Sequence, residues 1–490
     1  MRKLPVLTRE ELTGPRKAYV KVASRHLFLN ALRLDASLYS SAAFAARKVV
    51  SESGYALLTV SELVGKPNIF NPPPLKRYFS DSANGTPYLM PSELFLFRPV
   101  ASKYVFSGKI PGVDRWYVKE GWLLITQSGL PGLPIITTHD LEHFVISQNL
   151  IRIIPEDGQL VGYWYAVLSS WIGQALLMKN QFGITVEHIM PEHVGRVPVP
   201  QLPEDVQRRI HTNIMKAYGL RERGRELLRE AEQLLLKEMP AESLNDATQA
   251  YSVPCSGLNL RLDASYHEPL VRKTVELLRN STRVAKLADT AEVFVAPRFK
   301  RIYVNREMGV PFIQGAHTTM MKPIGLKYIS KLTKGLSNWV VSAGTILVTC
   351  SGTIGRVSLV PKAWDGWAVS QHALRILPDE GLNPGYLATF LATNWGYLQV
   401  VSKTYGGVVD EIDEEGMKEV IIPVIDDREQ KDIGARAIEA FGLREKANRI
   451  EDATVRTLEG ILTDRRGNDR LDSYIERLET MDSEREKTAT

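Results

Sequence analysis

Three sets of residues in this sequence could do chemistry, and the first is the run Asn71-Pro-Pro-Pro74. In amino-methyltransferases, Asn-Pro-Pro followed by an aromatic residue binds the target amine while the ring stacks on a flipped base. Here the fourth residue is Pro74, which cannot stack, and no Gly-rich cofactor loop follows a strand upstream. We therefore interpret the run as a rigid loop.

The second set is Ser351-Gly-Thr-Ile-Gly355, which lacks the Lys and the spacing of a phosphate-binding P-loop. It is more typical of a tight turn between strands, a turn that could still place Thr353 near a DNA backbone. The third set is the pair His139 and His143, which has no Cys or carboxylate partner at zinc-site spacing. The sequence thus predicts no catalytic residue and no metal site.

Basic residues beside aromatic ones occur twice, as Lys76-Arg77 and as Arg298 with Lys300-Arg301. Such residues can contact phosphates, although a solvated basic loop is the alternative. The polar loops that begin at Lys179 and Lys403 are candidates for base readout, because Asn and Gln can bond adenine through two hydrogen bonds. The candidate DNA-binding residues are Lys76, Arg77, Lys179, Asn180, Gln181, Arg298, Lys300, Arg301, Thr353, Lys403, Thr404 and Tyr405.

These residues belong to an internal repeat. The run Leu32-Arg-Leu-Asp-Ala-Ser37 recurs as Leu260-Arg-Leu-Asp-Ala-Ser265, and weaker matches continue at an offset of about 223 to 228 residues. The matches include Gln148 in the first copy and Gln371 in the second. Because this glutamine occurs in both copies, we expect it to make a shared structural bond and not to read a base. The loops between the matches differ, so the sequence predicts one fold used twice with two different surfaces.

Each copy predicts an α/β region followed by a long helix. Apolar runs bounded by turn residues predict strands at 122–126, 150–154, 345–349 and 357–360, and helices at 162–177 and 385–401. The long helices are expected at 203–239 and 426–462, each roughly 55 Å long at 1.5 Å per residue. Steps of three and four indicate that they pack together, antiparallel. The expected packing residues are Ile210, Ile214, Ala217, Leu220 and Leu227 on the first helix, and Ile433, Ala437, Ala440, Leu443 and Ile450 on the second.

The composition narrows the class of protein. The 490 residues are 44% hydrophobic and 24% charged with a net charge of +5, which is ordinary globular composition compatible with a polyanion partner. Two cysteines exclude a disulfide framework and favour a reducing, cytoplasmic compartment. The N-terminus has no signal-peptide pattern and no run is long and apolar enough to span a membrane.

With these residues in view, the chain resembles the specificity subunit of type I restriction-modification systems. The Leu34-Asp-Ala-x-x-Tyr39 pattern, the run Arg261–Pro269 and the strand-turn-strand from Ser351 to Pro361 are similar to segments of that family. The resemblance implies that each α/β region reads half of a split duplex DNA target. The helices would set the spacing and dock a methyltransferase subunit that carries S-adenosylmethionine, and a motor nuclease subunit could join; no cofactor is expected on this chain.

The expected organisation is an N-terminal extension (1–31), a first target recognition domain (32–200), a spacer helix (201–245), a second recognition domain (246–425), a second spacer helix (426–463) and a charged tail (464–490). Two other classes stay open at this point. One is a DNA-modifying enzyme, either a methyltransferase or a nuclease, and the other is a protein-binding scaffold.

Overall fold

The structure is a computed structural model that describes residues 41–74, 77–106, 108, 112–178, 188–241, 244, 250–258, 261–406, 410–464 and 471–480. It divides into two compact units. The first comprises Met1–Tyr88, Tyr104–Met215 and Glu451–Thr490, and the second comprises Leu89–Lys103 and Lys216–Ile450. The predicted N-terminal extension, the first copy of the Leu-Arg-Leu-Asp-Ala-Ser run, Lys76, Lys179, Asn180 and Gln181 lie outside the described residues.

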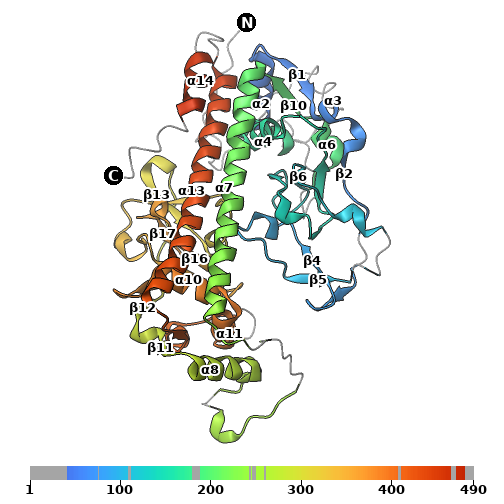
Figure 1. Ribbon diagram of the computed structural model, residues 1–490. Helices are drawn as coiled ribbons and strands as arrows, with labels where there is room; N and C mark the ends of the chain where they lie inside the picture. The colour runs from blue at the N-terminus through green and yellow to red at the C-terminus, as the bar shows by residue number, and fades with distance from the viewer. Residues whose placement is uncertain are drawn as a thin grey trace. The chain divides into compact units, whose positions relative to one another are not determined.

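The first unit holds three small sheets (Figure 1). The central sheet is antiparallel in the order β2-β9-β6-β7, with β2 at Ile69–Phe70, β9 at Leu150–Ile153, β6 at Leu123–Thr126 and β7 at Pro134–Ile136. The second sheet has the order β3-β5-β4-β8, and its strands are Phe79–Ser80, Lys103–Val105, Thr86–Leu89 and Val145–Ile146. The third pairs β1 (Ala56–Thr59) with β10 (Pro198–Gln201). Short helices complete the unit: α2 (Ser41–Glu52), α3 (Val60–Val64) and α6 (Pro191–Gly195).

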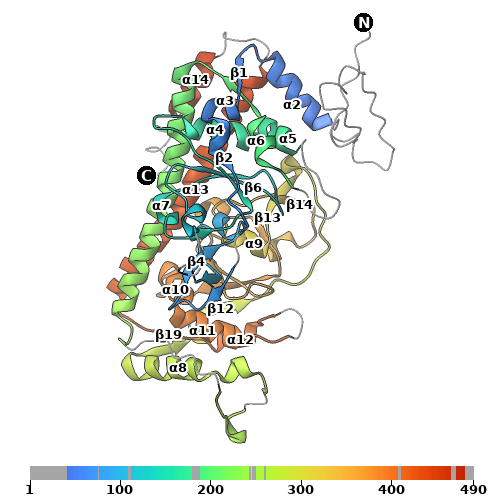
Figure 2. The same ribbon diagram turned by 90° about the vertical axis from the view of Figure 1, so that its right-hand side faces the viewer.

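The second unit repeats this arrangement, except that an isolated bridge between Tyr303 and Ile329 stands in place of β3. Its central sheet has the order β12-β18-β15-β16, formed by Ala291–Phe294, Ala373–Pro378, Ile346–Thr349 and Val357–Leu359. The sheet β14-β13-β17 contains Lys327–Ser330, Gly309–Ile313 and Ala368–Val369, and β11 (Val284–Lys286) pairs with β19 (Ile421–Pro423). Helix α8 (Pro269–Ser281) packs beside α11 (Asn394–Ser402), as Figure 2 shows. The unit also contains α9 (Gly315–Thr318) and α12 (Glu414–Lys418). The predicted α/β class, the four predicted strands and the internal repeat are confirmed.

One prediction is wrong in the same way in both copies, because each expected continuous helix is two helices. The first copy has α4 (Val161–Ser169) and α5 (Trp171–Met178), and the second has α10 (Pro384–Ala392) and α11. Ser170 and Thr393 stand at the breaks in extended backbone conformation. Gly173 and Gly396 then bring the next helix so close that a Cβ atom would lie 2.1 Å from the Val167 oxygen and 2.5 Å from the Phe390 oxygen. A glycine three residues after the break therefore permits a tight turn that apolar periodicity cannot reveal.

The repeated Gly-Tyr pair at the start of α4 and α10 anchors each domain to a neighbouring helix and strand. A Cβ on Gly162 would lie 2.7 Å from the carbonyl oxygen of His211. The hydroxyl of Tyr163 donates to the carbonyl of Pro200 (2.5 Å), and that of Tyr386 donates to Pro423 (2.6 Å). Both hydroxyls are buried, so these bonds fix the closing strands β10 and β19 in the two domains.

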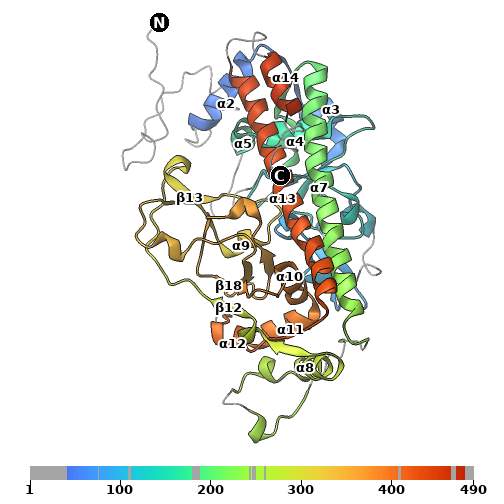
Figure 3. The same ribbon diagram turned by 60° about the vertical axis from the view of Figure 1, so that its left-hand side comes forward.

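The long helices are α7 (Glu204–Lys237) and α13 (Asp427–Thr463), close to the predicted bounds. Within the second unit they run antiparallel and side by side (Figures 1 and 3). Ala217 packs against Ala447 and Ile450, and Arg436 bonds Glu230 at 3.3 Å. At Gly224 a Cβ would lie 3.0 Å from the Ala440 oxygen, so small residues allow close approach. Of the expected packing residues, Leu220 and Leu443 are half-buried and the others are buried; these are Ile210, Ile214, Ala217, Leu227, Ile433, Ala437, Ala440 and Ile450.

A short antiparallel bridge in the second unit joins equivalent residues of the two copies. Leu96 pairs with Met320, which lies 224 positions later in the sequence. The backbone N–H of Phe97 donates to Thr319 (2.8 Å), and that of Met321 donates to Phe95 (2.7 Å). Each of these hydrogen bonds is the equivalent of the other in the opposite copy of the repeat. The bridge therefore follows the symmetry of the repeat.

Residues after α13 continue into the expected tail. Leu471–Thr480 form helix α14, in which Leu478 is buried and its carbonyl accepts a hydrogen bond from Asn213 Nδ2 (3.1 Å). This part of the expected charged tail is therefore a helix that packs within the first unit.

Candidate nucleic-acid interface

In the second unit three loops meet where strand β15 ends and β18 begins. The N–H of Cys350 donates to the carbonyl of His372 (3.1 Å), and the N–H of Ile412 donates to Cys350 (3.1 Å). Gly352 donates to Asp410 (3.2 Å), which extends the junction into the turn after β15. We refer to this junction of the loops at 350–355, 370–372, 403–406 and 410–412 as the loop platform.

The first unit has the same loop platform 223 positions earlier. Gln127 donates to Asn149 (3.0 Å), and Ile189 donates to Gln127 (3.1 Å). The turns after β6 and β15 are also alike, with positive φ at Gly129 (81°) and Gly352 (77°). The turn in the first copy, which reads as a degraded version in the sequence, therefore keeps the backbone geometry that needs glycine. This finding confirms that Ser351–Gly355 is a tight turn between two strands.

The side chains on the two platforms differ although the backbone bonds agree. Gln127 occupies the position of Cys350, and Asn149 that of His372. In the first platform Asn71 Nδ2 donates to Gln127 Oε1 (3.3 Å) and to the Gln148 carbonyl (2.7 Å). The apparent methyltransferase motif thus contributes a loop-fixing asparagine, as the rigid-loop interpretation expected.

In the second platform a cationic side chain, that of Arg301, is bonded to the loop at 370–372. Arg301 Nη2 donates to Gln371 Oε1 (2.8 Å), and Gln371 Nε2 lies 3.1 Å from His372 Nε2. The guanidinium carbon of Arg301 lies 5.3 Å from the centroid of the Phe312 ring, which is buried. Gln371 therefore makes a structural bond, and its partner is one of the predicted DNA-binding residues. The bond was predicted for both copies, but Gln148 Oε1 has no hydrogen-bond partner among the described residues, so it forms in the second copy alone.

The structure also brings Thr353 and Tyr405 onto one surface. Tyr405 and Glu411 exchange two backbone hydrogen bonds (2.9 and 2.8 Å), and Glu411 bridges to Ser351. Thr353 and Tyr405 are both exposed, one on the turn and the other on the hairpin beside it. Two candidates that lie 52 positions apart in the sequence therefore lie on joined loops.

Lys403 and Thr404 are held by the repeated Arg-Leu-Asp-Ala-Ser motif. Arg261 Nη2 donates to the Thr404 carbonyl (2.7 Å), while its Nε bonds Asp263 (2.8 Å). Lys403 Nζ lies 5.0 Å from the Tyr266 ring, and burial lowers the pKa of this amine. The motif thus braces the loop, and a contact of Lys403 or Thr404 with bases stays a prediction.

The basic segment before β13 is anchored by aromatic residues. Phe299 stacks on Trp339 with ring centroids 4.2 Å apart, and Trp339 Nε1 donates to the Pro297 carbonyl (2.7 Å). Arg298 and Lys300 are exposed on this segment, as is Arg77 in the first unit. They are placed so that phosphates could reach them, and that role stays a prediction.

Each platform is stabilised by a buried arginine that was not among the predicted site residues, Arg152 in the first unit and Arg375 in the second. Arg152 donates to the carbonyls of Leu150 (2.9 Å) and Ile146 (3.1 Å), and Arg375 donates to Val369 (2.9 Å) and Trp339 (3.0 Å). Burial lowers the pKa of both guanidinium groups to about 10. In the sequence, these arginines could have been found from the repeated Arg-Ile-x-Pro segments. Each arginine is a structural cation that joins two sheets of its domain.

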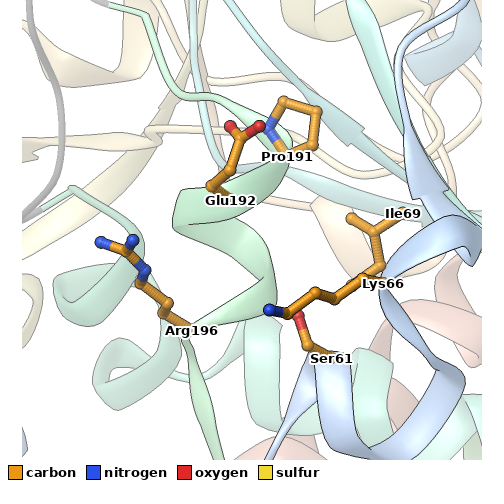
Figure 4. Close-up of a pocket in the computed structure, with 6 residues that line it drawn as sticks. All are labelled: Ser61, Lys66, Ile69, Pro191, Glu192 and Arg196. Carbon is orange, nitrogen blue, oxygen red and sulfur yellow. The ribbon is translucent and has the colours of Figure 1, made fainter.

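A separate pocket of about 240 Å³ in the first unit is lined by Ser61, Lys66, Ile69, Pro191, Glu192 and Arg196. Figure 4 shows the Lys66 amine pointing toward Ser61, while Glu192 and Arg196 extend in different directions. In the second unit Glu419 takes the position of Arg196 and pairs with Lys286 (3.2 Å). The pocket is therefore not repeated, and it takes no residue from the loop platform.

Over the described residues, no group of three or more His, Cys, Asp or Glu is arranged to hold a metal ion. Within the same residues no helix is long and apolar enough to cross a membrane. Burial raises the pKa of the Cys350 thiol to about 11, so this cysteine in the platform stays a neutral thiol at ordinary pH.

The chain thus contains two repeated domains that carry unlike side chains on loop platforms with like backbone bonds. Residues 282–451 match the family model described as "Type I restriction modification DNA specificity domain". Residues 282–451 therefore carry the sequence features of this DNA specificity domain. Over these residues the match agrees with the family resemblance that the sequence predicted.

The solved structures similar to this chain include the S subunit of a type I restriction-modification system from M. genitalium, with 11% identity, a TM-score of 0.32, and coverage of 84% of this chain and 95% of that one. The HsdS subunit from Thermoanaerobacter tengcongensis has 15% identity, a TM-score of 0.28, and coverage of 85% and 97%. A third, from work on assembly and conformational transition of the type I R-M system, has 15% identity, a TM-score of 0.28, and coverage of 85% and 98%. Comparison with curated proteins gives no match. The likeness to the type I restriction modification DNA specificity domain rests on the match of residues 282–451.

Proposed function

We propose that this chain is the specificity subunit of a type I restriction-modification system and that each of its domains reads one half of a split duplex DNA target through its loop platform. The observation that supports this most is the pair of platforms with equal backbone bonds and unequal side chains, Gln127 and Asn149 against Cys350 and His372. Equal scaffolds present their side chains in the same way, and unequal side chains select different bases. A two-part, asymmetric target is what such a pair can recognise.

The subunit works in this proposal with a methyltransferase subunit, which carries S-adenosylmethionine, and with a motor nuclease subunit where restriction follows. The paired helices α7 and α13 set the separation of the two half-sites and offer the docking surface for the methyltransferase. The complex acts on DNA in the cytoplasm. The exposed basic residues Arg77, Arg298 and Lys300 contribute phosphate contacts, which fix the register without reading sequence.

The test is to co-express the chain with its methyltransferase partner and to map modified bases in the host DNA. We expect modification at a single split sequence. Replacing residues 32–200 with the first recognition region of another specificity subunit should change one half of that sequence and leave the other half and the spacing as they were. A matched exchange of residues 246–425 should do the converse. Modification without sequence preference, or a change of both halves after one exchange, would contradict the proposal.

A further inference from the structure

The conformation of Arg301 differs from that of the other basic residues on its segment. Arg298 and Lys300 are exposed, whereas Arg301 is half-buried and fixed from two directions. Gln371 accepts a hydrogen bond from Nη2 (2.8 Å), and the ring of Phe312 lies under the guanidinium plane at 5.3 Å. Phe312 is itself buried and packs edge-on against Phe299, so the support cannot move easily.

Gln371 is equally well fixed. It follows Ser370, whose N–H donates to Ile313 (2.9 Å), and precedes His372, whose carbonyl accepts the Cys350 N–H (3.1 Å). Its side-chain amide lies 3.1 Å from His372 Nε2. The acceptor that orients Arg301 therefore belongs to the backbone junction of the loop platform.

The bond to Gln371 uses a neutral amide, so the guanidinium keeps its whole positive charge. Among the described residues no acceptor other than Gln371 bonds Arg301, which leaves the second N–H of Nη2 and the N–H groups of Nε and Nη1 for a ligand. The second Nη2 N–H forms a pair of parallel donors with one of these two neighbours. A guanidinium can offer two parallel donors, and on the major-groove edge guanine is the base that presents two acceptors, O6 and N7. A phosphate contact needs no such pre-orientation, because it tolerates many geometries.

We propose that Arg301 is a specificity-determining residue that reads a guanine in the half-site of the second domain, and that Gln371 is its positioning residue. The inference rests on the proposed function, since it names a base read by that same surface. The first domain repeats both residue types at equivalent positions, Arg77 and Gln148. There, the Gln148 Oε1 atom is buried and has no hydrogen-bond partner among the described residues, and Arg77 is exposed. The positioned arginine is therefore seen in the second domain.

The experiment uses the full chain in complex with its methyltransferase partner and a randomised duplex library, from which bound sequences are selected and read. R301K keeps the positive charge and removes the parallel N–H donors of the guanidinium. Q371L removes the side-chain oxygen that accepts a hydrogen bond from Arg301. K300A, which removes a neighbouring basic side chain, is the matched control. For the unaltered complex we expect a guanine at a fixed position of one half-site. R301K should reduce discrimination at that position by about 5- to 150-fold, the range supplied by one bidentate pair, with the other half-site unchanged. Q371L should weaken the same position to a smaller extent.

K300A should lower binding to all sequences and reduce the salt dependence by about one charge, with the selected sequence unaltered. The inference is overturned if R301K leaves the selected sequence unchanged, if it weakens all positions alike as K300A does, or if the unaltered complex selects no guanine in the affected half-site. Selection of no sequence at all by the unaltered complex would instead refute the proposed function. Because Arg301 is half-buried and lysine keeps its charge and most of its length, R301K should fold; R301Q, checked by circular dichroism, serves as the second variant.

Discussion

Gly219 and Gly224 lie on the same helix, α7, and their replacement by alanine should change stability in opposite directions. Alanine stabilises a helix interior by about 1 kcal/mol relative to glycine, and this gain applies to both positions. Gly219 is exposed, and nothing lies within 4 Å of an added Cβ. G219A should therefore raise the free energy of unfolding by about 1 kcal/mol.

At Gly224 the added Cβ would lie 2.9 Å from Phe97 Cζ and 3.0 Å from the carbonyl oxygen of Ala440. The oxygen belongs to the backbone of α13, so relief requires that the two helices separate. Overpacking of this kind costs about 1 to 3 kcal/mol, which equals or exceeds the helix-propensity gain. We expect G224A to lower the free energy of unfolding by up to about 2 kcal/mol.

Urea unfolding followed by circular dichroism measures both variants against the unaltered chain, and G219A is the matched control for G224A. The informative quantity is the difference between the two midpoints, because the helix-propensity gain cancels. If G224A raises the midpoint as much as G219A does, then α7 and α13 do not approach as closely as the geometry requires. The packing argument for Ala217, Gly224, Ala440 and Ala447 would then fail.

Three further predictions concern buried groups. His211 Nδ1 accepts the N–H of Gly162 (3.0 Å), and burial, with Arg208 nearby, lowers the pKa of His211. Its folded-state pKa then lies below the unfolded value of about 6.5, so its stabilising contribution is present above that pH and lost as the pH falls. H211N should lose less stability between pH 7.5 and 5.5 in urea titrations. Y386F should lower the free energy of unfolding by about 1 to 3 kcal/mol, because the Pro423 carbonyl loses its donor, measured against exposed Y397F. R261A should speed the exchange of backbone amide hydrogens at residues 403–406, because the Thr404 carbonyl loses its hydrogen bond from Arg261. R272A on α8 is the control and should leave this exchange unchanged.

Much of the scaffold could be predicted from the sequence because its signals are local or repeated. Strands β6, β9, β15 and β16 are short apolar runs between turn residues, and the long helices have apolar periodicity over many turns. The breaks within the expected helices could not be predicted, because Gly173 and Gly396 act by close approach in three dimensions. Apolar residues continue on both sides of each break, so the apolar pattern does not mark it.

Long-range hydrogen bonds account for most of what the sequence could not predict at the site. The sequence places Arg301 and Gln371 seventy positions apart, and nothing local connects them. The buried cations Arg152 and Arg375 occur in strands that read as apolar, and their only sequence signal is their repetition. A similar case is the start of α4, where Leu160 cannot cap the helix and His211 supplies the acceptor from another helix. In the second copy Asn383 caps α10 locally, and Gly434 takes the position of His211.

The residues that the two copies have in common limit how far the two DNA half-sites can differ. Arg77 and Gln148 repeat the pair Arg301 and Gln371, whereas Gln127 and Asn149 are replaced by Cys350 and His372. If the shared pair reads guanine in one half-site, an equal scaffold should read guanine at the equivalent step of the other. The bases opposite the replaced residues should then differ between the half-sites. The selected sequence of the unaltered complex tests this directly, and R77K should relax the guanine of the first half-site alone. Half-sites with no base in common at equivalent steps would show that the repeated pair serves the fold and not the recognition of DNA.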